Sequence, residues 1–380
     1  MGMYFTQEHE VIRKSVREFI AREITPYMDE WEEAGEFPAL IFKKLGDLGI
    51  LGLRCPEKYG GIDADLFSAL VIAEEMAQCG GAGLPMSIAV QSDMVIPTIL
   101  KFGSEEQIER FLLPAIKGEI ITALAITEPD AGSDVAGIKT FAVKDGDEWV
   151  INGSKMFITN GPRADVVIVV VKTEKAKGYL GVTLFLVEKG MPGFTVSKKL
   201  DKLGMRSSDT GELSFIDCRV PHSNVLGRVG EGFYHIMWEL QGERVAAAAG
   251  AVAVAQYCLD MGIKYAKERV QFERPISKFQ VIRHRFAELS AQLEAVRQFV
   301  YHMVYRIDNG EYPVKEISMC KLLSSRLAFE IADFVLQVHG GYGYMTEYPI
   351  SRLWRDIRLY RIGAGTDEIM LEIISKQLNL

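Results

Sequence analysis

Two stretches of the chain, TEPDAGSD at residues 127–134 and INGSKMFITNG at residues 151–161, decide how the fold is interpreted. The first has the pattern of a strand that ends in a tight turn. Thr127 and Ser133 offer hydroxyls there, and Gly132 allows the backbone to come close to a ligand. The second has the pattern of a strand followed by a turn. Each stretch alone is explained more simply as a capped β-turn, but their occurrence in one β-rich region favours a binding site.

Residues 119–226 around these stretches read as a middle antiparallel β domain. Their β-branched and aromatic runs are bounded by Gly, Asp and Asn, as strands are. A hairpin turn is expected at Lys144–Glu148. The expected strands include the runs Ile121–Thr127, Val166–Lys172, Val182–Val187 and Glu212–Ile216.

Helical patterns flank this β domain on both sides. Residues 1–118 predict an N-terminal helical domain whose first helix has Thr6 as its N-cap. Residues 227–380 predict a C-terminal four-helix bundle with two apolar stripes at helical spacing. The fold class is therefore mainly α with an inserted β domain. The stripes comprise Ile282, Phe286, Leu289, Leu293, Val296, Val300 and Met303, and then Cys320, Leu323, Leu327, Ile331, Phe334 and Val338.

Composition excludes several classes of function. The net charge of −8 is a poor match to nucleic acid. The five cysteines are scattered and the six histidines lack metal-site spacing, so neither a disulfide scaffold nor a metal is expected. The N-terminus has no apolar signal segment, and the apolar run Val245–Leu259 is too short to span a bilayer. We expect a cytoplasmic protein without membrane insertion.

Six motifs in order resemble the acyl-CoA dehydrogenase family over essentially the whole chain. They are TEPDAGSD, NGSKMFITN, KLGMRSSDTGELSF (202–215), ERVQFERPISKFQ (268–280), QVHGGYGY (337–344) and GTDEIM (365–370). The resemblance implies the family fold and an FAD-dependent oxidoreductase of fatty or carboxylic acid degradation. Such an enzyme converts an acyl-CoA to a 2-enoyl-CoA, passes hydride to flavin N5, and then passes electrons to an electron-transfer flavoprotein. It also implies a homotetramer, a dimer of dimers.

The resemblance also assigns cofactor contacts. Thr127 would bond the pyrimidine side of the flavin, and Ser133 the FAD pyrophosphate or nearby CoA. Phe157, where many relatives have Trp, would lie against the flavin, and Thr159 would meet N5. The adenine end of a neighbouring subunit's FAD would reach the bundle. The implied FAD residues are Leu124, Ile126, Thr127, Gly132, Ser133, Phe157, Ile158, Thr159, Arg269, Phe272, Gln280, Gln337, Val338, Gly340, Gly341, Thr366 and Glu368.

The catalytic base is where this sequence departs from many relatives. They carry Tyr-Glu-Gly-Thr near the C-terminus, whereas residues 363–366 here are Gly-Ala-Gly-Thr, and Ala364 cannot accept a proton. The long-chain and isovaleryl branch instead carries its base on a bundle helix, in a stretch ending Glu-Arg. The stretch GFYHIMWELQGERVAAAAG (232–250) places Glu243 at that position, followed by Arg244. The resemblance therefore implies Glu243 as the base.

Other interpretations of these residues stay open. Glu243 and Arg244 also fit a surface ion pair, although an acid at the start of a buried alanine-rich run is costly without a role. Arg244 would hold the loop around Glu243 or bind the CoA phosphates. Arg269 also fits a solvated charge paired with Glu268, and Glu239 is the nearest rival base. The implied substrate contacts are Ser133, Tyr234, Gln241, Arg244, Gly363 and Ala364.

Asp93 lies in a predicted helical region that lines the acyl pocket in relatives. It fits a helix cap or an internal hydrogen bond better than a second acid–base group. Two functions besides dehydrogenation also remain possible on this fold. One is an acyl-CoA oxidase or another flavin enzyme, and the other is a non-catalytic flavoprotein. The acyl group itself is not predicted.

Overall fold

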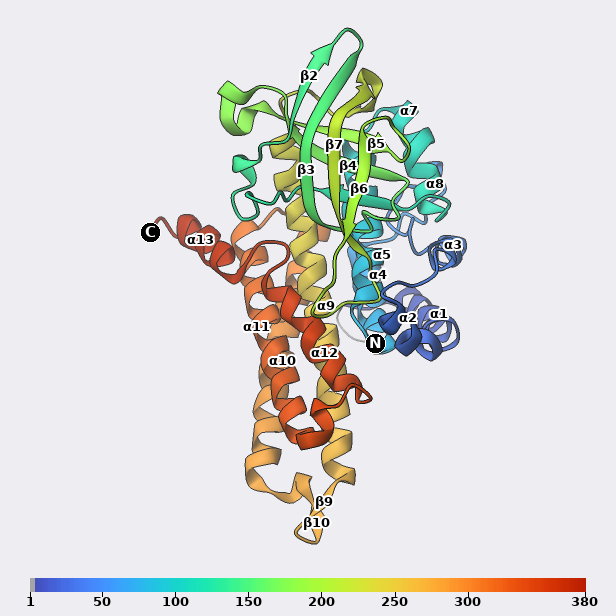
Figure 1. Ribbon diagram of the computed structural model, residues 1–380. Coiled ribbons are helices and arrows are strands. Elements are labelled where there is room, and N and C mark those ends of the chain that lie inside the picture. The colour runs from blue at the N-terminus through green and yellow to red at the C-terminus, as the bar shows by residue number, and fades with distance from the viewer. Residues whose placement is uncertain (1–3) are drawn as a thin grey trace.

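A computed structural model describes residues 4–380 of the chain, except for the side chains of residues 175–177. The chain forms an N-terminal group of helices, then a β-sheet, then a long helical bundle (Figure 1). The bundle extends away from the sheet, and the N-terminal helices pack beside both. The predicted order of helical, β and helical parts is confirmed.

The N-terminal helices begin where the sequence offers a cap. The Thr6 hydroxyl accepts the backbone N–H of His9, and the Thr6 N–H donates to His9 Nδ1, so α1 starts with a reciprocal capping box. This confirms the predicted N-cap. The helical elements are α1 (Gln7–Glu23), α2 (Met28–Ala34), α3 (Leu40–Asp47), α4 (Leu66–Met76), α5 (Gly83–Ala89), the π-helical η4 (Val90–Val95), α6 (Ile96–Phe102), α7 (Glu105–Gln107), the π-helical η5 (Ile108–Leu112) and α8 (Leu113–Ile116).

The middle sheet has the strand order β6-β7-β3-β2-β4-β5-β8, with β1 paired to β4. It is antiparallel except for the β1–β4 and β2–β4 pairs, which are parallel. These pairs join strands that are distant in sequence, because parallel neighbours cannot be linked by a hairpin. The strands are β1 (Thr122–Ala125), β2 (Phe141–Asp145), β3 (Glu148–Thr159), β4 (Val166–Lys172), β5 (Val182–Glu188), β6 (Phe194–Lys199), β7 (Thr210–Pro221) and β8 (Val225–Leu226).

Strand β4 explains why Val166–Val171 is continuously apolar. Val166, Ile168 and Val170 pack in a core shared with the N-terminal helices. The alternate residues Val167 and Val169 pack on the other face, in the sheet's own core. A strand buried on both faces needs no polar alternation. The sheet is therefore fixed to the N-terminal helices by one of its faces.

The C-terminal bundle is built on three long helices. The α10 seam is confirmed, because Phe286, Leu289 and Leu293 are all buried. The α11 stripe is wrong at Leu323, which is 46% exposed because that position faces away from the neighbouring helices. The helices are α9 (Gly232–Glu268), α10 (Gln280–Asp308), α11 (Val314–His339), α12 (Pro349–Ile357) and α13 (Asp367–Gln377), with a small hairpin of β9 (Val270–Gln271) and β10 (Arg274–Pro275) at the tip.

Helix α9 is the longest element and packs in the centre of the bundle. The helix and the segment Gly83–Phe102 are both long and apolar enough to cross a membrane. The apolar run Val245–Leu259 is therefore part of a much longer helix than expected from that run alone. More than half of each segment is buried inside the protein, which accounts for its apolar character. The core helices of soluble proteins pass the same test.

All five cysteines are free and buried. Cys55 and Cys79 lie among the N-terminal helices, Cys218 on β7, Cys258 on α9 and Cys320 on α11. Burial raises the pKa of each of these thiols above its usual value. The cysteines are therefore packed as apolar side chains in all three parts of the fold.

Candidate active site

The two quoted stretches lie side by side at one end of the sheet. The backbone N–H of Met156, on β3, donates to the carbonyl of Thr127 at 2.8 Å. The Lys155 ammonium donates to the carbonyl of Ile126 at 2.8 Å and to Glu128 Oε1 at 2.8 Å. The Glu128 carboxylate also accepts the backbone N–H groups of Lys139 and Thr140. The turn after β1 is therefore fixed to β3 at Thr127.

Lys155 and Glu128 form a buried ion pair, with 0% and 5% of their side chains exposed. Burial lowers the pKa of Lys155 to about 8, against the opposing effect of Glu128. Burial also acts to raise the pKa of Glu128, but Lys155 and the backbone donors hold it below its usual value. The pairing of Glu128 with Lys155 is not predictable from the sequence, because the two residues are 27 positions apart.

A β-bulge turns Phe157 out of the sheet. The register between β3 and β7 shifts between Lys155 and Ile158, and Phe157 adopts a left-handed φ of 64°. Phe157 is 64% exposed, whereas Ile158 is 3% exposed and packs in the sheet core. Phe157 therefore presents an aromatic surface next to Thr127 and Thr159, whereas the Ile158 carbonyl already accepts the N–H of Gly161 at 3.1 Å.

The turn at residues 131–133 is tight, with Ala131 buried beneath it. The N–H groups of Glu128 and Ala131 each donate to the other's carbonyl, at 2.9 and 3.2 Å. Gly132 and Ser133 are exposed, and a Cβ on Gly132 would meet nothing nearer than Thr127 Cγ2 at 3.9 Å. Leu124 and Ile126 are partly buried against the core. An exposed phenyl ring, threonine hydroxyls and an exposed turn at Gly132 and Ser133 together fit a flat, polar-edged ring system such as the isoalloxazine of FAD.

Glu243 lies in the first part of α9, opposite the loop of residues 363–366. The backbone N–H of Ala364 is near enough to its carboxylate to act on the pKa of Glu243. Burial raises that pKa, and the nearby charges of Arg244 and Lys321 and the Ala364 N–H oppose the rise. A desolvated carboxylate with a raised pKa suits a general base.

Two cations hold the loop that carries Ala364. Arg244 is 4% exposed, and its Nε donates to the carbonyl of Ala364 at 3.2 Å. The Lys321 ammonium, on α11, donates to the carbonyl of Gly365. Ala364 has a left-handed φ of 56°, which an alanine adopts at a cost. This geometry favours loop holding over CoA binding as the role of Arg244.

Two further polar residues of α9 are buried beside this site. Glu239 is 2% exposed and Gln241 is 7% exposed. Neither carboxyl oxygen of Glu239, nor Oε1 of Gln241, has a hydrogen-bond partner among the residues that the structure describes. The pKa of Glu239 is raised well above its usual value, first by burial and then by the Glu243 charge. The sequence singled out Glu239 only as a rival base.

Asp93 lies on η4, between the sheet and α9. Gln91 of the same segment accepts the N–H of Thr122 on β1 at 3.1 Å, and a Cβ on Gly242 would lie 3.9 Å from the Asp93 carbonyl. The Asp93 carboxylate accepts the Ser92 hydroxyl at 3.1 Å, and burial raises its pKa. The predicted internal hydrogen bond is present, and any acid–base role stays a hypothesis.

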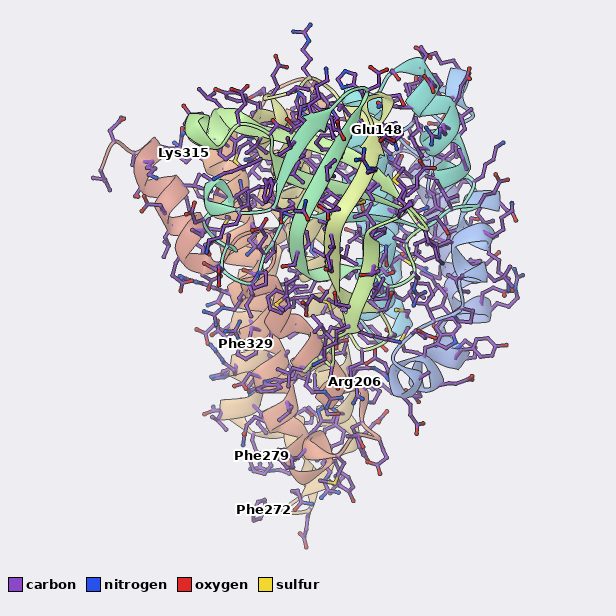
Figure 2. All side chains as sticks on the ribbon, turned by 45° about the horizontal axis from the view of Figure 1, so that its top comes forward. Glu148, Arg206, Phe272, Phe279, Lys315 and Phe329 are labelled. Carbon is purple, nitrogen blue, oxygen red and sulfur yellow. The ribbon has the colours of Figure 1, made fainter. Side chains whose placement is uncertain are left out.

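The implied cofactor residues at the tip of the bundle lie far from Glu243. Arg269 caps the far end of α9, roughly 39 Å from Glu243 at about 1.5 Å per residue. Its guanidinium lies 5.6 Å from the ring centre of Tyr342. Phe272 projects from the bundle tip with 86% of its surface exposed (Figure 2). Gln280, Gln337, Val338, Gly340 and Gly341 surround the same end, and the two glycines have open space around them.

The remaining implied residues lie at the edges of the site. Thr366 caps α13 by accepting the N–H of Ile369 at 3.3 Å, and Glu368 is exposed in the first turn of that helix. Gly363 is partly buried in the loop, and Tyr234 is 55% exposed at the start of α9. The capping role alone explains a threonine at position 366, without a bound ligand.

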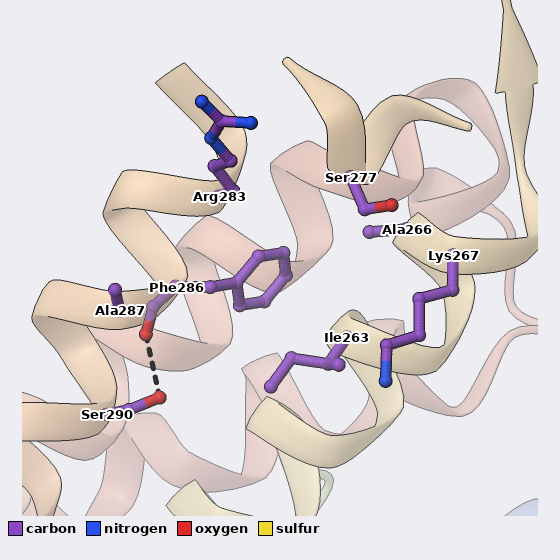
Figure 3. A pocket seen from close by; sticks show the side chains of 8 residues that line it. All are labelled: Ile263, Ala266, Lys267, Ser277, Arg283, Phe286, Ala287 and Ser290. Atoms are coloured by element: carbon purple, nitrogen blue, oxygen red, sulfur yellow. Dashed lines mark hydrogen bonds between the residues drawn. The ribbon is translucent and has the colours of Figure 1, made fainter. Parts of the chain in front are cut away.

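A separate pocket of about 300 Å³ lies at the far end of the bundle, between α9 and α10 (Figure 3). Lys267 and Arg283 border it, and its floor is apolar at Ile263 and Phe286. At about 1.5 Å per residue, Ile263 is roughly 30 Å along α9 from Glu243, so this pocket does not belong to the site of the base. Among residues with described side chains, no group of three or more His, Cys, Asp or Glu is arranged to hold a metal.

Comparison with known proteins identifies the family. Residues 6–119, 123–218 and 230–379 match the N-terminal, middle and C-terminal domains of acyl-CoA dehydrogenase. The chain is 42% identical, over 98% of its length and 87% of the relative's, to the mitochondrial long-chain specific acyl-CoA dehydrogenase of Sus scrofa.

Solved structures agree with this match. The acyl-CoA dehydrogenase of Geobacillus kaustophilus superimposes with a TM-score of 0.98 at 41% identity, over 100% of both chains. A chain of a structure described as an electron transferring flavoprotein of Acidaminococcus fermentans superimposes with a TM-score of 0.96 at 36% identity, over 100% of this chain and 99% of that one. This chain belongs to the acyl-CoA dehydrogenase family. It is an FAD-dependent oxidoreductase that acts on acyl-CoA.

Proposed function

We propose that Glu243 removes the α-proton of an acyl-CoA thioester to give a 2-enoyl-CoA. The observation that carries the proposal is the contact between α9 and the 363–366 loop. Arg244 Nε donates to the Ala364 carbonyl at 3.2 Å, and the Ala364 N–H is near enough to Glu243 to oppose the rise of its pKa. A carboxylate therefore stands beside the loop position at which many relatives carry their base, although the loop itself has none.

In this scheme the Ala364 N–H can face either of two acceptors, the Glu243 carboxylate or the thioester carbonyl of the substrate. In the free protein it lies near Glu243 and opposes the rise of the Glu243 pKa. A thioester carbonyl that takes over this N–H gains a donor for the charge that develops as the α-proton leaves. Glu243 loses the same donor and becomes a stronger base. The bound flavin supplies the acceptor, at N5, for the hydride of the β-carbon.

The pH dependence follows from the ionisation of Glu243. Only its carboxylate form can take a proton, so flavin reduction should fall as the pH decreases through its raised pKa. Water exclusion by the bound acyl chain should raise that pKa further. The acid limb of the profile should thus lie above the ordinary range of a glutamate.

Arg244→Lys should slow flavin reduction roughly tenfold at saturating substrate, since a lysine cannot reproduce the forked donor. Arg244 bonds Ala364 and faces Glu243 and Glu239 at once. The rate of anaerobic flavin bleaching measures the effect. Arg228→Lys, at an exposed arginine paired with Glu231, is the control. Equal rates of flavin reduction in the two variants would show that Arg244 has no role in the site.

We further propose a homotetramer, a dimer of dimers, in the cytoplasm, with an electron-transfer flavoprotein as acceptor. The separation of roughly 39 Å between Glu243 and Arg269 supports the assembly. The residues at the bundle tip are too far away to share one cofactor with this chain's own base. They suit the cofactor of a neighbouring copy. Five free cysteines fit a reducing compartment.

The test is anaerobic mixing of the FAD-loaded protein with straight, branched, aromatic and alicyclic acyl-CoAs. Loss of flavin absorbance with at least one of them is the expected result, and the fastest identifies the acyl class. If none of them bleaches the flavin, the proposed reaction is wrong. Rapid reoxidation in air without a carrier would identify an oxidase in place of a dehydrogenase.

A further inference from the structure

Glu239, which is buried, and Glu243, which is partly buried, lie one turn apart on α9. Residues four apart on a helix are neighbours. The two side chains affect each other's ionisation, and the Glu243 charge raises the pKa of Glu239. Two carboxyl groups at neighbouring, poorly solvated positions do not both ionise readily, so the pair holds one proton over a broad pH range.

The surroundings of the two carboxyls decide where that proton resides. The anion of Glu243 is stabilised by the Ala364 N–H and by the charges of Arg244 and Lys321. Glu239 is 2% exposed, accepts no hydrogen bond from the described residues, and faces only Arg244 as a cation. Glu243 therefore ionises first, and Glu239 keeps the proton.

Ionisation of Glu239 would disturb the site through Arg244. The guanidinium lies within the field of both carboxylates and also bonds the Ala364 carbonyl. A second anion one turn from Glu243 competes with it for Arg244. It also opposes the negative charge that develops on the substrate as its α-proton leaves.

We infer that Glu239 is a positioning residue, the protonated partner of Glu243, and that loss of its proton switches the enzyme off at alkaline pH. The inference rests on the proposed role of Glu243. It assigns the acid limb of the pH profile to Glu243 and the alkaline limb to Glu239.

Other ionisable groups around the pair must be separated from Glu239. Lys321, on α11, has a pKa lowered to about 8 by burial, so its deprotonation also falls in the alkaline range. Tyr312 lies near Glu239 and Arg244, and burial raises its pKa to about 12. On η4, the Asp93 carboxylate is bonded to Ser92 and lies in the field of Arg54. One turn before Glu239, His235 Nε2 is 3.9 Å from Glu231.

The experiment measures anaerobic single-turnover flavin reduction from pH 6 to about pH 10 in the FAD-loaded protein. The substrate is the best acyl-CoA of the panel. In wild type the rate constant at limiting substrate should fall roughly tenfold per pH unit beyond the alkaline pKa. Glu239→Gln should lose this decline and keep the acid limb. Glu239→Met is the second neutral variant, should the amide impair folding.

Two control variants test whether the alkaline limb of the pH profile belongs to Glu239. Lys321→Arg keeps a cation that does not titrate in this range, so its alkaline limb should persist. Glu268→Gln changes an exposed glutamate of the same helix and should reproduce the wild-type profile. A wild-type profile without an alkaline limb overturns the inference. So does a limb that survives Glu239→Gln or disappears in Lys321→Arg.

A second readout does not depend on turnover. Glu239 has its pKa raised in the folded state, so above the unfolded value near 4.5 the unfolded chain binds fewer protons than the folded one. Wild type should therefore lose stability relative to Glu239→Gln as the pH rises, and the gap in Tm should widen. A constant gap overturns the inference. Unimpaired flavin reduction in Glu243→Gln would instead overturn the proposed function.

Discussion

Glu243→Gln should reduce flavin at least about a hundredfold more slowly than wild type while FAD stays bound. The amide keeps the size of the carboxylate and an oxygen that accepts the Ala364 N–H, so the loop of residues 363–366 should stay in place. It cannot accept a proton from carbon. The change therefore removes the base and keeps the shape of the site.

The measurement is single-turnover bleaching of the flavin under anaerobic conditions. Flavin content is read from absorbance, and acyl-CoA binding from the perturbation of the flavin spectrum. Glu268→Gln, at the exposed end of the same helix, should match wild type. A Glu243→Gln rate within a few-fold of wild type would contradict the assignment of the base.

Lys155→Met should lower the free energy of unfolding by about 3–5 kcal/mol, because it leaves the Glu128 carboxylate buried without its cation. Lys155 also donates to the Ile126 carbonyl, so its loss should loosen Thr127 and weaken FAD binding. Urea denaturation followed by circular dichroism measures the first effect. Titration of the apoprotein with FAD measures the second.

The double variant Glu128→Gln/Lys155→Met separates these two effects. It removes both charges and keeps an acceptor for the N–H groups of Lys139 and Thr140, so most of the stability should return. Lys139→Met breaks the exposed pair with Asp130 and should cost about 0–1 kcal/mol. A loss of this small size in Lys155→Met would show that the buried pair is not an anchor.

Local patterns predicted the elements of the fold well. Thr6 begins a helix because its hydroxyl is suited to the cap, and Val166–Lys172 is a strand with both faces buried. Leu323 was misplaced because helical spacing does not say how far neighbouring helices reach around a face. The two parallel strand pairs were missed because local sequence does not determine the partner of a strand.

The candidate site was only partly predictable. Motif resemblance pointed to Thr127, Phe157 and Glu243, and these remain predictions of role. The exposure of Phe157 depends on a bulge opposite β7, which its own stretch does not reveal. Likewise, Lys155 meets Glu128, and Lys321 meets Gly365, only after distant segments pack together. Such contacts arise from tertiary packing and leave no spacing signal.

The buried cysteines can report on local opening of the protein. A thiol-reactive reagent cannot reach a sulfur that is packed in a core, so its reaction rate reflects how often that part of the protein opens. Cys79, Cys218 and Cys258 lie in the helical N-terminal part, the sheet and α9 respectively. Mass spectrometry of alkylated peptides would therefore show, without any introduced label, which part opens first when the cofactor is removed.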